Sequence, residues 1–159
     1  MERPAQGSAL VTAAVRGKSL LLPLELERCA ELPGGGWPLI VHGVPRTKKN
    51  SLRMALNRST GGRFPIQSKA AKRWEHLAVL QLQMQWGDLP ALAEPVGVHA
   101  VVFRQRDVGD LNNYLAAIAD ALEHAGVLVN DKYIRNWDGS RLNKDALHPR
   151  VELLITRLQ

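Results

Sequence analysis

Three carboxylates in the second half of the chain are spaced in a way that suits a divalent cation. Asp110 follows a predicted strand and turn, Asp120 lies ten residues later in a predicted helix, and Asp131 lies just past that helix. At 100° per residue, Asp110, Asn113 and Asp120 fall within about 60–80° of one another around the helix, opposite the leucine stripe. Mg²⁺ binds one or two protein carboxylates and keeps positions open for water and phosphate. An ion placed here would polarise a phosphodiester and lower the pKa of an attacking water.

Each of these carboxylates also has a purely structural interpretation. Asp110 occupies the position of a helix N-cap, a role that contributes ~1 kcal/mol to stability. Asp120 is compatible with a solvated helix position, and Asp131 with a turn. The spacing alone therefore leaves both the metal site and the structural roles open.

The elements around these residues follow from periodicity and turn signals. Residues 96–103 are rich in valine and predict a strand, and residues 104–109 predict a turn. Asp110 then precedes apolar residues spaced by four, three and four, the pattern of an amphipathic helix that ends at Gly126. These apolar residues are Leu111, Leu115, Ile118 and Leu122.

The preceding part of the chain predicts two strands and a helix. We expect strands at residues 39–42 and 63–66, with a loop or an irregular hairpin at residues 46–62. Ser68 is a candidate N-cap for a helix that runs to Trp86 and is stopped by Gly87 and Pro90. Near its end, apolar residues alternate with glutamines, which is a strand period, but length, composition and cap favour a helix.

The whole chain predicts a small α/β (α+β) protein. Residues 133–143 and 151–158 resemble the two arms of a terminal hairpin, so the order is roughly β-β-α-β-α-β-β, a mixed sheet with two main helices packed on it. Residues 1–37 are predicted to be an N-terminal extension, flexible or contributing a strand at residues 20–26 that Pro23 limits to a sheet edge. Residues 38–159 form the expected functional domain.

Composition and charge narrow the class of protein. The net charge is +6, and residues 46–73 hold nine basic and no acidic side chains, a field that attracts phosphate backbones. One cysteine excludes an internal disulfide, and no apolar run approaches ~18 residues, so we expect a cytoplasmic protein with no membrane partner. The predicted DNA-binding residues are Arg46, Lys48, Lys49, Arg53, Arg58, Arg63, Lys69, Lys72 and Arg73, with Arg104 and Arg106 beside the acidic residues.

The order of these motifs resembles one family of nucleases. The segment Asp110-Leu111-Asn112-Asn113 is followed by Asp120-Ala121-Leu122, Gly126, Asn130-Asp131 and Ile134. Upstream lie Val44-Pro45, Lys48-Lys49-Asn50-Ser51 and Ser68-Lys69-Ala70. This arrangement, over residues 39–158, is similar to that of the RusA-like Holliday junction resolvases (crossover junction endodeoxyribonucleases).

The resemblance implies a mixed-sheet fold, a homodimer and Mg²⁺-dependent (or Mn²⁺-dependent) cleavage of four-way DNA junctions in recombination and repair, one cut by each subunit. It implies that Asp110 and Asp131 are the principal catalytic metal ligands. Asn112 would be a weak neutral ligand, and Asp120 a supporting carboxylate.

The chain departs from the family pattern at three positions. Asn112 and Asn130 stand where the pattern has aspartates, and Ala116 stands where it has a lysine. A missing unit charge beside a divalent ion costs several kcal/mol, since two unit charges 4 Å apart interact by ~4 kcal/mol at an effective dielectric constant near 20. Three alternatives follow from these departures: a weakened enzyme, an enzyme with substitute ligands among Asp107, Asp120 and Asp138, or a catalytically degenerate junction- or DNA-binding protein on the same fold. Separately, nothing in the sequence distinguishes DNA from RNA as the ligand.

Overall fold

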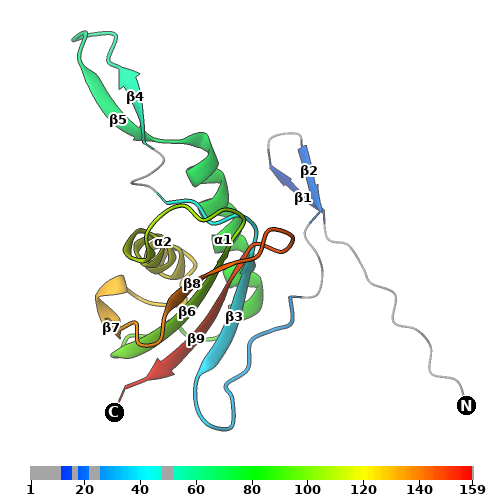
Figure 1. The fold of residues 1–159 in the computed structure, drawn as a ribbon. Helices are drawn as coiled ribbons and strands as arrows, with labels where there is room; N and C mark the ends of the chain where they lie inside the picture. Colours follow the sequence, from blue (N-terminus) through cyan, green and yellow to red (C-terminus); the bar gives the residue numbers. More distant parts are fainter. Residues whose placement is uncertain (1–11, 16–17, 22–25, 48–51, 159) are drawn as a thin grey trace, which may run out of the picture.

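The computed structural model describes residues 12–15, 18–21, 26–47 and 52–158. This part of the chain is an α+β protein, and its strands and helices follow roughly the predicted order (Figure 1). In chain order the elements are β1 (Thr12–Val15), β2 (Lys18–Leu21), β3 (Trp37–His42), β4 (Leu52–Leu56), β5 (Arg63–Gln67), α1 (Lys69–Trp86), β6 (Val96–Arg104), α2 (Leu111–His124), the 3-10 turn η2 (Asp131–Tyr133), β7 (Ile134–Asn136), β8 (Arg141–Lys144) and β9 (Arg150–Arg157).

The main sheet is built around β6. In the described residues its order is β3-β9-β6-β7, and β8 pairs with β6 beyond β7. Strand β9 is antiparallel to both β3 and β6, whereas β7 and β8 are parallel to β6. Helix α2 therefore serves as the crossover of a βαβ unit, which carries the chain from one end of β6 back to its beginning.

The predicted terminal hairpin is wrong. Residues 141–144 and 150–157 do form strands, but β8 and β9 each pair with β6, which lies between them. Strand β6 is apolar and largely buried, as is typical of a central strand that has neighbours at both edges. The second predicted arm is β9, whereas the first is divided into β7, a turn and β8. The predicted pairing fails because it depends on where α2 returns the chain.

The hydrophobic core lies between the sheet and the two helices. Alternate residues of β9 are buried on the helix side, and these are Val151, Leu153 and Ile155. They belong to one buried cluster with Trp74, Ala78 and Leu82 of α1 and with Leu115, Ile118 and Leu122 of α2. The leucine stripe predicted for α2 is thus its core-facing side.

Helix α1 begins and ends where its capping residues predict. The Ser68 hydroxyl accepts a hydrogen bond from the Ala71 amide at 3.1 Å, and the helix ends at Gly87, which has a φ of +59°. A positive φ favours glycine because it has no Cβ. None of the helices in the described residues is long and apolar enough to span a membrane.

Two buried glutamines of α1 complete the free edge of β3. Gln85 accepts from the Ile40 amide at 2.9 Å and donates to the Ile40 carbonyl at 2.7 Å. Gln81 accepts from the His42 amide at 2.8 Å and donates to the His42 carbonyl at 3.0 Å. Four helix residues rise about 6 Å, close to the ~6.6 Å between alternate strand residues, so the two amides match the edge in register. This explains the alternating glutamines, which are a helix feature.

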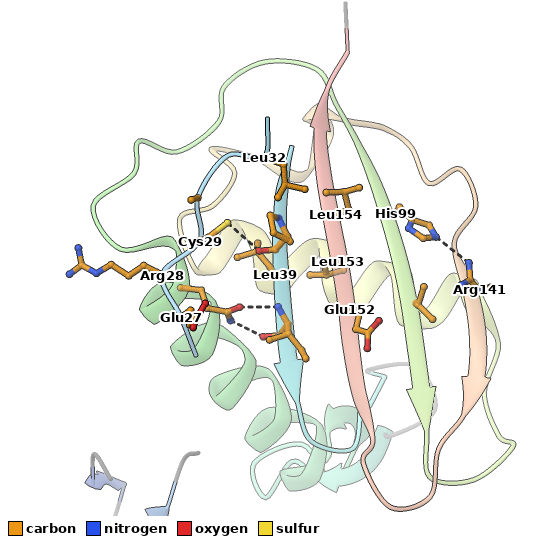
Figure 2. A pocket seen from close by; sticks show the side chains of 15 residues that line it. Glu27, Arg28, Cys29, Leu32, Leu39, His99, Arg141, Glu152, Leu153 and Leu154 are labelled. Atoms are coloured by element: carbon orange, nitrogen blue, oxygen red, sulfur yellow. Dashed lines mark hydrogen bonds between the residues drawn. The ribbon is translucent and has the colours of Figure 1, made fainter. Parts of the chain in front are cut away.

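The other face of the main sheet is hollowed into a cavity of about 710 Å³ (Figure 2). The segment around Cys29 borders it on one side, and His99 of β6 and Arg141 of β8 border it on the other. The Cys29 thiol donates to the Pro38 carbonyl at 3.2 Å, and burial raises the pKa of that thiol. Cys29 is thus a weak hydrogen-bond donor here, and its thiol has no general base as a partner in the described contacts.

Two further strand pairs lie outside the main sheet. Strands β1 and β2 pair with each other, and the predicted strand at residues 20–26 overlaps β2 but extends into residues 22–25, outside the described residues. Strands β4 and β5 form an antiparallel hairpin that extends from the body (Figure 1). The strand predicted at residues 63–66 is confirmed, and the preceding loop contains β4, the hairpin alternative of that prediction.

Candidate nucleic-acid interface

A polar cavity of about 530 Å³ lies where β6 ends and α2 begins. Its walls are residues 44–47, which follow β3, and the loop that follows β6, with Tyr114 of α2. Three arginines line it: Arg46, Arg104 and Arg106. Arg46 and Arg106 are exposed, so their guanidinium groups are accessible to an anion.

Arg104 holds the loop that leads to α2. Its guanidinium donates to the Val108 carbonyl at 3.2 Å and to the Gly109 carbonyl at 3.3 Å, and it forms an ion pair with Asp107. The side chain is only 11% exposed, and its Nε is buried without a hydrogen-bond partner among the described residues. Arg104 is therefore mainly a loop-fixing residue, whereas Arg46 and Arg106 supply the accessible charge.

Gly109 and Tyr114 fix the start of the helix. The Tyr114 hydroxyl donates to the Val108 carbonyl at 2.9 Å. Gly109 has a φ of +86°, and a Cβ there would lie 2.9 Å from the Tyr114 hydroxyl, so only glycine fits. Burial raises the pKa of Tyr114 against the opposing charges of Arg104 and Arg46, so this hydroxyl stays a proton donor at neutral pH.

Asp110 is the N-cap of α2, as its position predicts. One carboxylate oxygen accepts from the Asn113 amide at 3.0 Å, and the other accepts from the Asn113 side chain. The residue is exposed and directly follows the arginine-lined loop. Asn112, also exposed, is the next polar residue of this turn. The structural interpretation of Asp110 is therefore correct, and the residue directly follows Gly109, which lines the cavity.

The predicted DNA-binding residues fall into three groups. Arg46 lines the cavity and also lies next to Ala71 and Trp74 of α1, which brings the cavity close to the beginning of that helix. The exposed cations of that beginning are Lys69, Lys72 and Arg73. Arg58 and Arg63 are exposed on the β4–β5 hairpin. Lys48, Lys49 and the Arg53 side chain lie outside the described residues, although the backbone of Arg53 pairs opposite Ile66.

Asp131 lies at the other end of α2. Its amide donates to Glu123 Oε2 at 2.8 Å, and the Asn130 side chain donates to the same oxygen at 3.3 Å. Glu123 lies in the last turns of α2 and was not predicted from the sequence. The sequence signal for Glu123 would have been its position in the last turn of the helix, just before the loop that leads to Asp131.

The predicted ligands do not fit one Mg²⁺ ion within a single chain. Asp110 and Glu123 are thirteen residues apart, which is about 20 Å along a helix, whereas two ligands of one Mg²⁺ lie within about 4 Å. Asp120 is half-buried and about 15 Å along the axis from Asp110. Asp107 is paired with Arg104, and Asp138 is an exposed residue of the β7–β8 turn. In the part of the chain that the structure describes, no group of three His, Cys, Asp or Glu residues is arranged to hold a metal.

This separation places Asp110 and Asp131 too far apart to share one Mg²⁺ ion within a single chain. The metal-site roles of Asp110, Asn112, Asp131 and Asp120 stay predictions. The helix wheel places Asp110 and Asp120 on one side of α2, but it ignores the distance along the axis. The crossover then carries the chain back to the beginning of β6, where Ile134 pairs with Val96. Asp131 precedes that strand and is thus at the opposite end of β6 from Asp110.

Comparison with known proteins adds no family assignment. No protein-family model matches the chain, and no curated protein matches it. The similarity to the RusA-like resolvases therefore rests on the motif residues named above.

Proposed function

We propose that this protein binds DNA, with the arginine-lined cavity at the end of β6 as its phosphate-contacting centre. The observation that carries the proposal is that Arg46 lines this cavity together with Arg106 and also lies next to Ala71 and Trp74, in the first turns of α1, where the exposed cations are Lys69, Lys72 and Arg73. Arginine forms paired hydrogen bonds with phosphate oxygens, and a helix N-terminus adds favourable dipole and amide interactions. The resemblance makes a branched four-way junction the expected form of DNA.

Binding to matched substrates tests this proposal. A four-way junction, a linear duplex of the same sequence and the corresponding RNA are titrated in EDTA by fluorescence anisotropy over a series of salt concentrations. We expect the junction to bind most tightly and the logarithm of affinity to fall with the logarithm of salt, with a slope near −0.9 per phosphate contacted. Tighter binding of the matched RNA would replace DNA by RNA as the ligand.

Charge-matched variants locate the interface. Arg46→Gln and Arg106→Gln should each weaken binding and reduce the salt slope by about one. Arg28→Gln is the control, because Arg28 is 78% exposed and lies near Gly87 at the far end of α1. Equal losses in all three variants would mean that only net charge matters, and the assigned interface would be wrong.

A RusA-like endonuclease is the second candidate, because Asp110 is exposed and directly follows the loop that lines the arginine cavity. Since one chain separates Asp110 from Asp131, cleavage would require carboxylates from two chains. An end-labelled four-way junction is incubated in Mg²⁺ and in Mn²⁺ with native protein, Asp110→Asn, Asp131→Asn and a mixture of the two variants. A site shared between subunits requires cleavage by the native protein, none by either variant, and partial recovery in the mixture. Absence of cleavage by the native protein would leave the DNA-binding function alone.

A further inference from the structure

The β4–β5 hairpin, which we call the arm (residues 52–67), carries exposed apolar side chains. Met54 and Leu56 are each 61% exposed, Phe64 is 46% exposed and Ile66 is 39% exposed. The strands of the arm pair with each other and, among the described residues, with no other strand. A two-stranded hairpin is marginal in water by itself, so this surface suits a partner more than solvent.

The arm displays these side chains on both faces. Opposite residues of an antiparallel pair share a face, so Met54 lies with Pro65 and Leu56 with Arg63 on one side. Phe64 lies with Ala55 on the other. A narrow ribbon that is apolar on both sides has the form of a wedge.

The tip of the arm is ordered by its own hydrogen bonds. The Asn57 amide donates to the Gly62 carbonyl at 2.8 Å, and the Gly61 amide donates to the Asn57 carbonyl at 2.8 Å. The Asn57 side chain accepts from the Ser59 amide at 2.9 Å. These contacts close the loop between the two strands, so the apolar residues are presented on a formed hairpin.

Charge decides which partner suits the arm. Residues 46–73, which include the whole arm, hold nine basic and no acidic side chains. A second copy of the same surface would be repelled, whereas a polyanion would be attracted. Among polyanions, nucleic acid also offers flat apolar surfaces, because unstacked bases pack on aromatic and aliphatic side chains.

We propose that the arm is a base-contacting wedge, in which Met54, Leu56 and Phe64 insert against unstacked bases of DNA while Arg58 and Arg63 hold the flanking phosphates. This inference rests on the proposed DNA-binding function and specifies how that function acts on DNA. It adds direct base contact to the phosphate contact at the arginine-lined cavity. Branched DNA suits it, since bases at a branch point unstack at lower cost than bases within a duplex.

The test uses the full chain and a four-way junction with 2-aminopurine at the branch point, whose fluorescence rises when the base unstacks. We expect a several-fold rise with native protein. In the Met54→Ser/Leu56→Ser/Phe64→Ser variant the rise should be lost, and affinity should fall by about 5- to 150-fold for each stacked base removed. Leu147→Ser is the control, because Leu147 is 84% exposed in the β8–β9 turn, and it should behave as native protein.

The outcomes separate the wedge from the function it rests on. Failure of native protein to bind any DNA overturns both proposals. Salt-dependent DNA binding that is unchanged in the triple variant, with a silent 2-aminopurine signal, overturns the wedge alone. Conversion of a dimer to a monomer in the triple variant, measured by sedimentation without any change in base fluorescence, would identify the arm as a protein–protein contact and also overturn the wedge.

Discussion

Among the described residues, β3 and the strands of the β4–β5 arm each lack a neighbouring strand on one side, and they differ in what covers them. At β3, the backbone groups of Ile40 and His42 are bound by the side-chain amides of Gln85 and Gln81. Both glutamines are buried: Gln81 is 2% exposed and Gln85 is 3% exposed. On the arm, the large apolar side chains are open to solvent.

The difference shows where this protein avoids partners and where it is suited to one. An unprotected edge strand pairs readily with strands of other chains, and the two amides remove that possibility at β3. The arm has no equivalent cover in the described residues, and its basic character selects a polyanion. The exposed apolar side chains of the arm are therefore a candidate binding surface, whereas helix α1 covers the edge of β3.

The largest expected effect is at the sealed edge. Gln85→Ala should lower the free energy of unfolding by about 2–4 kcal/mol, because it removes three side-chain hydrogen bonds and leaves the backbone groups of Ile40 unpaired. Urea denaturation measures this change. Gln83→Ala, on the exposed side of the same helix, is the control and should stay within about 0.5 kcal/mol. A loss below about 1 kcal/mol for Gln85→Ala would show that the edge is not sealed by this residue.

Removing the N-cap residue Asp110 should lower the free energy of unfolding less than removing Gln85 does. Asp110→Ala should cost about 1 kcal/mol by removing the N-cap of α2, whereas Asp110→Asn should retain most of that stability. Thermal unfolding followed by circular dichroism compares the three proteins. Equal losses in both variants would indicate that the charge, and not the capping geometry, stabilises the helix.

The β8–β9 turn is held by the carboxylate of Asp145, so the contribution of this turn to stability should respond to pH. Asp145 accepts from the His148 and Leu147 amides and from Arg150, and these interactions lower the pKa of Asp145 from its ordinary value of 3.8. Its contribution is present above the unfolded pKa and is lost as pH falls through the lower folded pKa. The side-chain amides of Gln81 and Gln85 do not titrate, so their contribution at β3 should not depend on pH.

Urea midpoints between pH 6 and pH 2.5 should therefore fall less steeply in Asp145→Asn than in native protein. Asp138→Asn, at an exposed turn position, is the matched control and should follow the native curve. Parallel curves for all three proteins would argue against a stabilising role for the Asp145 contacts in this turn.

The smallest effect is expected on the arm. Phe64→Ser should change the free energy of unfolding by less than about 0.5 kcal/mol, since Phe64 is exposed and lies outside the buried cluster. Urea denaturation should thus show a several-fold smaller change in the free energy of unfolding for Phe64→Ser than for Gln85→Ala. A large loss would mean that the arm packs on the body, and its surface would then not be available to DNA.

Local features of this protein were predictable from its sequence. Ser68 and Asp110 cap the two helices, and apolar spacing identifies the buried side of α2, because these interactions connect residues within one or two turns. The valine-rich run at β6 predicts a buried strand for the same reason. The candidate cations were also identifiable, since charge is a property of residue type.

Long-range geometry was not predictable. The alternation of glutamines with apolar residues did not indicate that Gln81 and Gln85 bind the edge of β3, because their partners lie 39 and 45 residues away in the sequence. The spacing in the sequence allows Asp131 to join Asp110, but the α2 crossover places the two at opposite ends of β6. Glu123 drew no attention because its partners, Asn130 and Asp131, come from the following loop.

The sequence by itself determined the helices, the central strand and the basic character of residues 46–73, because each depends on near neighbours or on composition. Tertiary structure alone decided strand partners, the seal on β3, the arginine-lined cavity and the separation of Asp110 from Asp131. The physical reason is that these features depend on how a 14-residue crossover helix and an 18-residue capping helix span the sheet. Distances across a sheet are set by packing of its layers, and no local period encodes them.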